Sequence, residues 1–331
     1  MKQLLVDGIA AFVCAAVVIA GAQGVSPEAQ KHIDAARAAA ATDHMGLFQP
    51  LCDGALALAK PPAPRGGGPG RGPGRQGGPP PPPARETWHA EPVKVFDNMY
   101  YVGMTEYSSW AITTSQGIIL LDAIYDYSIE DEVVEGLKTL GLNPADIKYV
   151  IVAHGHLDHA GGAKYLQEKY GARLIMSAAD YDLLDQQNPP WKPKRDMVAT
   201  DGMKVTLGDT TLTLVHIPGH TPGTMGTIVP VKLRGTPHSV IVLGATQMPT
   251  RESLLQFEHV FNDYARPAKV EASLNMHANG LQDDLEFLEA IRKNPDAPNP
   301  YLYGPERFGR WMSIMIECGR ARLAALGVPT S

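Results

Sequence analysis

The sequence has few cysteines and no excess of basic residues, and both shortages exclude classes of protein. Three of the 331 residues are cysteine, too few for a disulfide scaffold or a cysteine-rich zinc module. The formal net charge is −6, from 29 basic and 35 acidic residues, whereas nucleic-acid binding usually requires a basic face. With 44% hydrophobic and 19% charged residues, the chain is typical of a globular protein, and we expect no nucleic-acid partner.

The N-terminus has the three parts of an export signal. Lys2 gives a positive start, residues 10–20 are apolar, and the small residues at 20–22 form a cleavage site. The apolar run over residues 8–22 has 15 residues, short of the ~20 that span a bilayer. We therefore predict that residues 1–22 are a signal peptide, that no stable membrane anchor remains, and that the protein is exported to the periplasm or secreted.

The stretches that follow differ sharply in composition. Residues 23–60 open with Ser26-Pro27, a typical helix start, and an alanine-rich run then predicts a short helical N-terminal segment. Residues 61–83 contain 10 prolines and 8 glycines and cannot bury a core, so we predict a disordered linker at 61–87. The remaining residues, 88–331, have the pattern of one compact domain.

Short apolar runs alternate with helical patterns along this domain. Strands are predicted at residues 93–96, 99–102, 109–114, 118–122, 147–153, 173–177, 203–207, 211–217, 224–230 and 239–243. Helices are predicted at residues 130–140, 160–170, 281–293 and 307–326. Strands followed by helices, twice over, predict an α/β fold in which two halves pack sheet against sheet.

Four potential metal ligands come directly after the apolar run that ends at residue 153. They are His154, His156, Asp158 and His159, within six residues. This spacing does not suit a helix, where paired ligands recur four residues apart, and it favours a loop at a strand end. Imidazole and carboxylate groups are common zinc ligands. The cluster therefore predicts a metal site rather than a polar surface loop.

Two further histidines offer ligands from other loops. His220 lies in the Gly- and Pro-rich turn PGHTPG, and His277 lies in the segment NMHAN. Either histidine alone would be a weak signal, but with the first cluster they complete six ligands, enough for two metal ions. His216 lies within a predicted strand, and we interpret it as structural.

The segment HGHLDHAGG resembles the HxHxDH signature of the metallo-β-lactamase superfamily, and TPGHTPG and His277 sharpen this likeness. The stretches at residues 100–103, 117–122, 201–202 and 207–208 resemble class B, subclass three. Over about residues 88–325, the resemblance implies an αββα sandwich of two packed mixed β-sheets flanked by helices. It also implies two zinc ions per chain. The first would be held by His154, His156 and His220, and the second by Asp158, His159 and His277.

Later residues separate the branches of this superfamily. The first subclass places a cysteine on the second zinc, and no cysteine lies between Cys52 and Cys318. Many other hydrolases of the superfamily carry a bridging aspartate where this chain has Gly-Ala-Thr at residues 244–246. The missing cysteine favours the third subclass over the first, and the missing aspartate favours a β-lactamase-like site. Thr246 keeps the first of two hydroxyls that hold the substrate carboxylate in the subclass, but Met248 replaces the second, so we expect an altered substrate pocket.

The resemblance implies an exported, zinc-dependent hydrolase of the antibiotic-resistance type, in which a zinc-bound hydroxide attacks the amide bond of a β-lactam ring. Asp158 would fix the second zinc and orient the nucleophile, and Thr246 would contact the substrate. The alternative is the same site acting on another cyclic amide or ester, such as a lactone. The partner is a small-molecule substrate in either case. The oligomeric state, and whether Cys52 and Cys318 pair, stay open.

Overall fold

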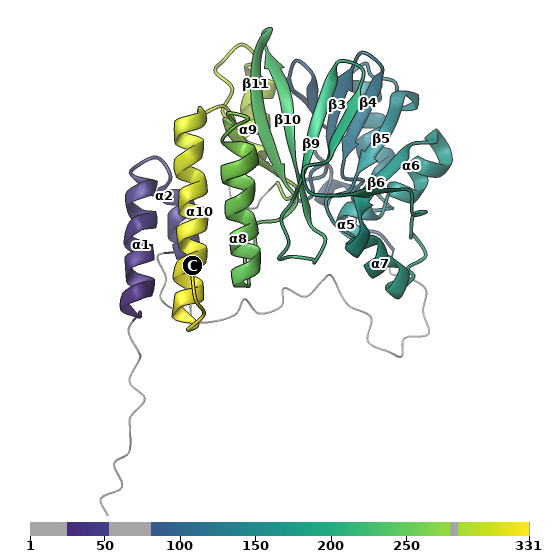
Figure 1. Cartoon of the computed structure of the whole chain (residues 1–331). Helices are drawn as coiled ribbons and strands as arrows, with labels where there is room; N and C mark the ends of the chain where they lie inside the picture. The colour runs from purple at the N-terminus through teal and green to yellow at the C-terminus, as the bar shows by residue number, and fades with distance from the viewer. Residues whose placement is uncertain (1–24, 53–80, 279–283, 331) are drawn as a thin grey trace, which may run out of the picture.

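Two β-sheets pack face to face in the computed structural model, which describes residues 25–52, 81–278 and 284–330 (Figure 1). The first sheet has seven strands in chain order: β1 (Val93–Phe96), β2 (Met99–Tyr101), β3 (Trp110–Thr114), β4 (Gly117–Leu121), β5 (Ile147–Ile151), β6 (Arg173–Ser177) and β7 (Met197–Ala199). The second has five, in the order β12 (Ala272–Asn275), β11 (Thr236–Leu243), β10 (Met225–Leu233), β9 (Thr210–His216) and β8 (Lys204–Leu207). The predicted signal peptide and residues 61–80 of the predicted linker lie outside the described residues.

Both sheets are mixed. Strands β1 to β4 are antiparallel and β4 to β7 are parallel. In the second sheet, β12 runs parallel to β11 and the other pairs are antiparallel. The parallel strands of an α/β protein are covered on both faces, which explains why the apolar runs of β4 and β5 are nearly continuous.

Alternation along the strands creates three apolar layers. In β4, Ile119 and Leu121 face the second sheet, whereas Ile118 and Leu120 face outward, because successive side chains of a strand point to opposite faces. In β11, Val240 and Val242 lie in the layer between the sheets, and Ile241 belongs to the outer layer. Each sheet therefore needs a cover of helices on its outer face.

Helices supply that cover on both sides (Figure 1). On the first sheet lie a helical segment at Glu130–Thr139, which includes α4 (Glu135–Thr139), and then α5 (Leu157–Ala160), α6 (Ala163–Tyr170) and α7 (Ala178–Gln187). On the second sheet lie α8 (Arg251–His259) with its continuation Val260–Ala265, and α10 (Pro305–Ala325). Helix α9 (Asp284–Lys293) contributes Leu288 and Ile291 to the layer between the sheets. The predicted αββα sandwich is confirmed.

The N-terminal segment belongs to the same core. Helix α1 (Pro27–Ala40) is capped by Ser26 and packs along α10, as does α2 (Met45–Cys52) (Figure 1). Ile33 and Phe48 are buried beside Trp311 of α10, and Cys52 forms a disulfide with Cys318 of α10. The sequence-based expectation of a compact unit confined to residues 88–331 is therefore too narrow, because apolar side chains of α1 and α2 complete the outer core of the second sheet.

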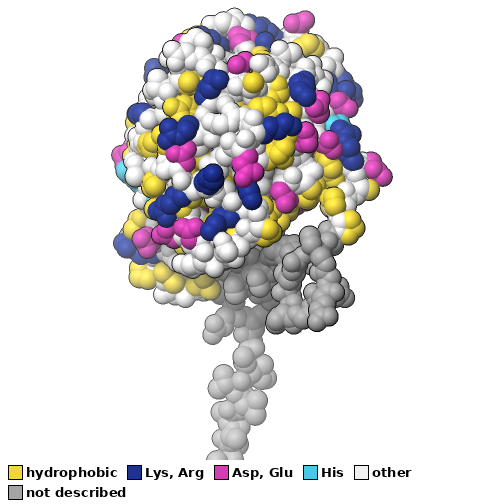
Figure 2. Space-filling model, turned by 90° about the vertical axis from the view of Figure 1, so that its right-hand side faces the viewer, with side chains coloured by type: hydrophobic (Ala, Val, Ile, Leu, Met, Phe, Trp, Pro, Cys, Tyr) yellow, Lys and Arg dark blue, Asp and Glu magenta, His cyan; other side chains and the backbone are white. Residues whose placement is uncertain are grey.

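Basic and acidic side chains are interspersed on the face shown in Figure 2, so charge of neither sign dominates that face. Among the described residues, oppositely charged side chains form ion pairs, such as Arg195 with Asp182 and Lys192 with Asp185. Within the described ranges, no helix combines the length and the apolar composition that a bilayer crossing requires.

Candidate metal centre

The site forms where the ends of the two sheets meet. Beyond β5, Val152 donates a backbone hydrogen bond to Ile175, and Ala153 accepts one at 2.8 Å from Met225 at the start of β10. The chain then turns, and His156 precedes α5, whose single turn carries Asp158 and His159. His154 and His156 therefore lie in the loop that the spacing of the sequence motif predicts, whereas Asp158 and His159 lie in a one-turn helix that it does not predict.

The first group of ligands consists of His154, His156 and His220. Nδ1 of His156 lies 3.1 Å from Nε2 of His220, and the buried ring of His154 lies 4.6 Å from that of His220, centroid to centroid. The three ligand atoms all lie within 4.8 Å of one another. The loop between β9 and β10 therefore brings His220 to the residues that follow β5.

The second group consists of Asp158, His159 and His277. Nε2 of His159 lies 3.1 Å from Nε2 of His277 and 3.3 Å from Oδ2 of Asp158. His277 follows β12 and forms an isolated β-bridge with Tyr107, so the backbone fixes its place. The rings of His154 and His159 are 4.0 Å apart, and the two groups are therefore immediate neighbours.

These separations fit tetrahedral coordination of a metal such as zinc. With Zn–N bonds of 2.0–2.1 Å, two ligand atoms of a tetrahedral ion lie about 3.3 Å apart, close to the 3.1 and 3.3 Å observed. Both ring nitrogens of His154 are buried without a hydrogen-bond partner among the described residues. Buried polar groups rarely stay unsatisfied, and a cation in the first group would satisfy one nitrogen.

A buried aspartate that sequence reasoning did not assign to the site supports the second group. Asp122 follows β4 and is fully buried. Its Oδ2 lies 2.5 Å from Nδ1 of His159, and its Oδ1 accepts a hydrogen bond from the backbone N–H of Ala153 at 2.7 Å. The contact directs Nε2 of His159 toward His277. The signal in the sequence was an acidic residue that closes an otherwise apolar strand.

The two ligand groups differ in the pKa values of their histidines. Burial lowers the pKa of His154 and His156 and lowers the pKa of His220 to about 4. Burial acts the same way on His159, but Asp122 and Asp158 outweigh it and raise the pKa of His159 to about 10. Burial opposes ionisation of Asp158, but the charges of His159 and His277 hold its pKa well below the usual range. The first group is therefore neutral at pH 7, whereas His159 is protonated until a metal displaces its proton.

Tyrosines stand beside the second group. The Tyr107 ring lies 5.0 Å from the rings of both His277 and Tyr125, centroid to centroid, and Tyr125 stacks on Tyr127 at 4.9 Å. All three tyrosines are half-buried. Aromatic rings therefore border the second group on this side.

The two residues discussed for substrate binding differ in their surroundings. Thr246 is half-buried, and the backbone of its neighbour Gln247 touches Gly219, next to His220. Met248 is only 7% exposed and lies in the helical core, with its thioether against Gly319 of α10. The expectation that residue 248 belongs to the substrate pocket is wrong, because this side chain packs into the core between α8 and α10.

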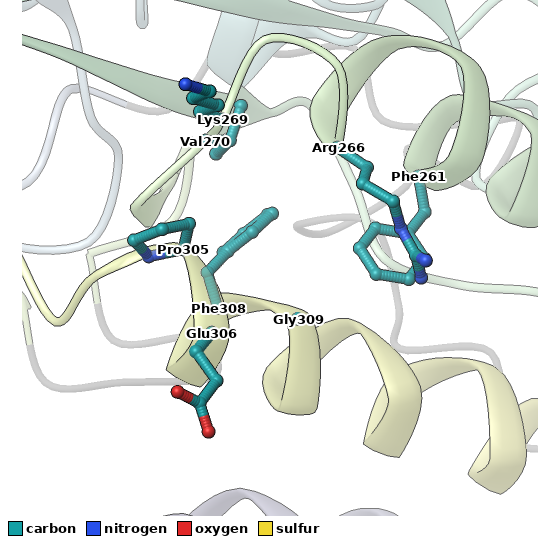
Figure 3. A pocket seen from close by; sticks show the side chains of 8 residues that line it. All are labelled: Phe261, Arg266, Lys269, Val270, Pro305, Glu306, Phe308 and Gly309. Atoms are coloured by element: carbon teal, nitrogen blue, oxygen red, sulfur yellow. The ribbon is translucent and has the colours of Figure 1, made fainter.

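A separate cavity of about 170 Å³ lies at the N-terminal end of α10 (Figure 3). Its walls come from two chain segments, residues 261–270 and 305–309: Phe261, Arg266, Lys269, Val270, Pro305, Glu306, Phe308 and Gly309. The guanidinium of Arg266 lies over the Phe261 ring at 4.7 Å. No residue of the two metal-ligand groups lines this cavity.

Comparison with known proteins agrees with the fold. Residues 103–230 match the family model of the Metallo-beta-lactamase superfamily, the family that the HxHxDH motif resembles. Members of the superfamily are metal-dependent hydrolases. The matched residues include His154, His156, Asp158, His159 and His220, whereas His277 lies beyond them.

The structural neighbours are subclass B3 metallo-β-lactamases. BJP-1 of Bradyrhizobium japonicum is 28% identical, with a TM-score of 0.56 over 68% of this chain and 90% of that one. The class B3 di-zinc enzyme LRA-12, from an Alaskan soil metagenome, has a TM-score of 0.58 over 71% of this chain and 94% of its own, at 21% identity, which bears on the fold alone.

The curated relatives include N-acyl homoserine lactonases. An N-acyl homoserine lactonase of a Bacillus species is 31% identical over 110 residues, which are 32% of this chain and 42% of that protein. The chain spans about two-fifths of the length of the first curated relatives it matches. The comparisons therefore agree on the domain and its metal-dependent hydrolytic class and differ on the substrate.

Proposed function

We propose that this protein is an exported di-zinc hydrolase that opens the amide bond of β-lactam rings. The observation that carries the proposal is the composition of the second ligand group, Asp158, His159 and His277. It contains no cysteine, and no carboxylate follows β11, where residues 244–246 are Gly-Ala-Thr. The 28% identity to BJP-1 over 90% of that enzyme supports the same assignment.

The chemistry divides between the bound metal and this chain. When bound, zinc lowers the pKa of a coordinated water to about 7 and polarises a carbonyl oxygen. The chain contributes two histidine-rich ligand groups side by side, with the first group already unprotonated at neutral pH. Asp158, kept ionised beside His159, would hold the second ion and orient the attacking water, and Thr246 would contact the substrate carboxylate.

A second candidate function is lactone hydrolysis. Its support is the 31% identity to an N-acyl homoserine lactonase over 110 residues. Both reactions attack a cyclic carbonyl, so the same ligand groups would serve either substrate. The difference would lie in the groups around the metal ions, where this chain has Ala245 in place of a bridging carboxylate and aromatic rings at Tyr107 and Tyr125.

Export is part of the proposal. It rests on the signal-peptide pattern of residues 1–22 and is supported by the Cys52–Cys318 disulfide, because disulfides persist mainly in oxidising compartments. N-terminal sequencing of the protein recovered from a periplasmic fraction should begin at Gln23. Recovery of the intact N-terminus from the cytoplasm would contradict export.

The activity is tested with the zinc-loaded protein on a panel of a penicillin, a cephalosporin, a carbapenem and an N-acyl homoserine lactone. We expect β-lactam hydrolysis that a chelator abolishes and clavulanate leaves unchanged, because no serine is acylated. Asp158→Asn is the matched control, since it keeps the size of the side chain and removes its charge. Rapid lactone opening with no turnover of any β-lactam would favour the second candidate.

A further inference from the structure

Asp180 is a buried acid with an unusual set of neighbours. It lies in the first turn of α7, where Ser177 caps the helix, and the Ser177 hydroxyl lies 3.2 Å from both the backbone nitrogen and Oδ2 of Asp180. Its side chain is 0% exposed, and no lysine or arginine within the described ranges pairs with it. Acidic residues are almost never fully buried without such a partner, so the cap alone does not explain this carboxylate.

One neighbour belongs to the loop that carries His220. Thr221 donates its hydroxyl to Oδ2 of Asp180 at 3.0 Å, and its backbone N–H donates to Thr224 at 3.0 Å. The loop passes so close that a Cβ at residue 223 would meet the Ser177 hydroxyl and lie 2.6 Å from Oδ2 of Asp180. Glycine at 223 therefore permits the contact, and Asp180 fixes the residue next to His220.

The other neighbour lies between the two remaining ligands of the first group. A Cβ built on Gly155 would come within 3.0 Å of the Asp180 carbonyl oxygen and 3.3 Å of its Cβ. Burial raises the pKa of Asp180, and a hydrogen bond from the Gly155 backbone to its carboxylate opposes that rise. Asp180 therefore touches both chain segments that supply the first group, although α7 itself supplies no ligand.

We propose that Asp180 is a positioning residue for the first metal site, holding the loop of His220 against the segment of His154 and His156 through its bond to Thr221. The inference rests on the proposed di-zinc function. Asp122 contacts its ligand His159 directly, whereas Asp180 acts on the first group through Thr221, next to His220. Each buried carboxylate would fix ligands without binding the metal. Carboxylates that support ligands in this way typically contribute 10- to 100-fold in metal affinity.

The test separates the two sites by removing one ligand at a time. In a His277→Ala background the first group alone is complete, and in a His220→Ala background the second group alone is complete. Zinc affinity is measured in each background by competition with a chelating dye, before and after Asp180→Asn. We expect a loss of about 10- to 100-fold in the first background and no change in the second.

A second pair of variants keeps the result interpretable if Asp180→Asn does not fold. Thr221→Val removes the hydroxyl but keeps the side-chain shape, and should reproduce the first-site loss, whereas Thr221→Ser should retain affinity. Two results would overturn the inference: an equal loss of zinc affinity in both backgrounds, or a lower melting temperature of the metal-free protein without any loss of affinity. Either result would show that Asp180 only stabilises the start of α7. Zinc content of the unmodified protein is measured first, and a value near zero would instead overturn the proposed function.

Discussion

His159 Nδ1 lies 2.5 Å from Oδ2 of Asp122, and both side chains are fully buried. The contact leaves only Nε2 of His159 for a metal ion, and that atom faces His277 and Asp158. A carboxylate that holds a ligating histidine in this way fixes both its tautomer and its orientation. The second site thus depends on a residue that would not itself touch the metal.

Asp122→Asn should weaken the second site selectively. The amide keeps the size of the side chain and can still accept from Ala153, but it loses the charge that orients His159. We expect zinc affinity at the second site to fall about 10- to 100-fold, with little change at the first. Competition titrations in the His220→Ala and His277→Ala backgrounds measure the two effects separately. Equal losses at both sites would show that Asp122 supports the fold as a whole.

The two sites should also differ in their dependence on pH. The pKa of His159 is raised to about 10 by Asp122 and Asp158, so at neutral pH a proton must leave before its nitrogen can bind a metal. Second-site affinity should therefore rise about tenfold per pH unit between pH 6.5 and 8.5.

The first site should respond much less over the same range. The pKa values of its histidines are lowered, that of His220 to about 4, so no ligand proton has to be released. The same single-site variants, titrated with zinc at several pH values, give both slopes. Parallel slopes would contradict the charge difference between the two groups.

Four of the six candidate ligands were predictable from sequence because they crowd into six residues, a spacing that needs no tertiary information. His220 and His277 gained weight only beside that cluster. The supporting acids were harder to find. Asp122 closes an apolar strand, which is a faint local signal, and Asp180 shows none, because its partner Thr221 lies 41 residues further along the chain. Contacts between distant loops are set by the packing of the two sheets, and a single sequence does not reveal them.

Most strands and helices were also predictable, with informative exceptions. Strand β12 has four residues and β7 has three, too short for a clear periodicity, and α7 is largely polar with only Tyr181 and Leu184 as large buried apolar residues. The docking of α1 and α2 on α10 was hidden by the Pro- and Gly-rich stretch, whose composition suggests separation in space. Composition describes a linker and does not say where the segment before it packs.

The Cys52–Cys318 disulfide should stabilise the protein substantially. It joins α2 to α10 across 266 residues of sequence, with a Cα–Cα distance of 5.2 Å. Removing a disulfide that closes a long loop typically costs about 2–5 kcal/mol, because the unfolded chain gains freedom. We expect Cys52→Ala, Cys318→Ala and the double variant to lose similar amounts in urea unfolding. Reduced protein should then match the double variant, and losses that simply add would argue against the bond.

Residues 246 and 248 should respond in opposite ways to substitution. Met248 is buried between α8 and α10, so Met248→Ser leaves a cavity and a hydroxyl without a partner. Shortening a buried methionine costs about 2–5 kcal/mol, and we expect a lower melting temperature with no gain in substrate affinity.

Thr246 is half-buried beside the His220 loop, and Thr246→Ala should raise KM for β-lactams while stability stays within about 0.5 kcal/mol. Steady-state kinetics and thermal unfolding of both variants test these expectations. A lower KM for Met248→Ser would show that residue 248 contributes to the substrate pocket.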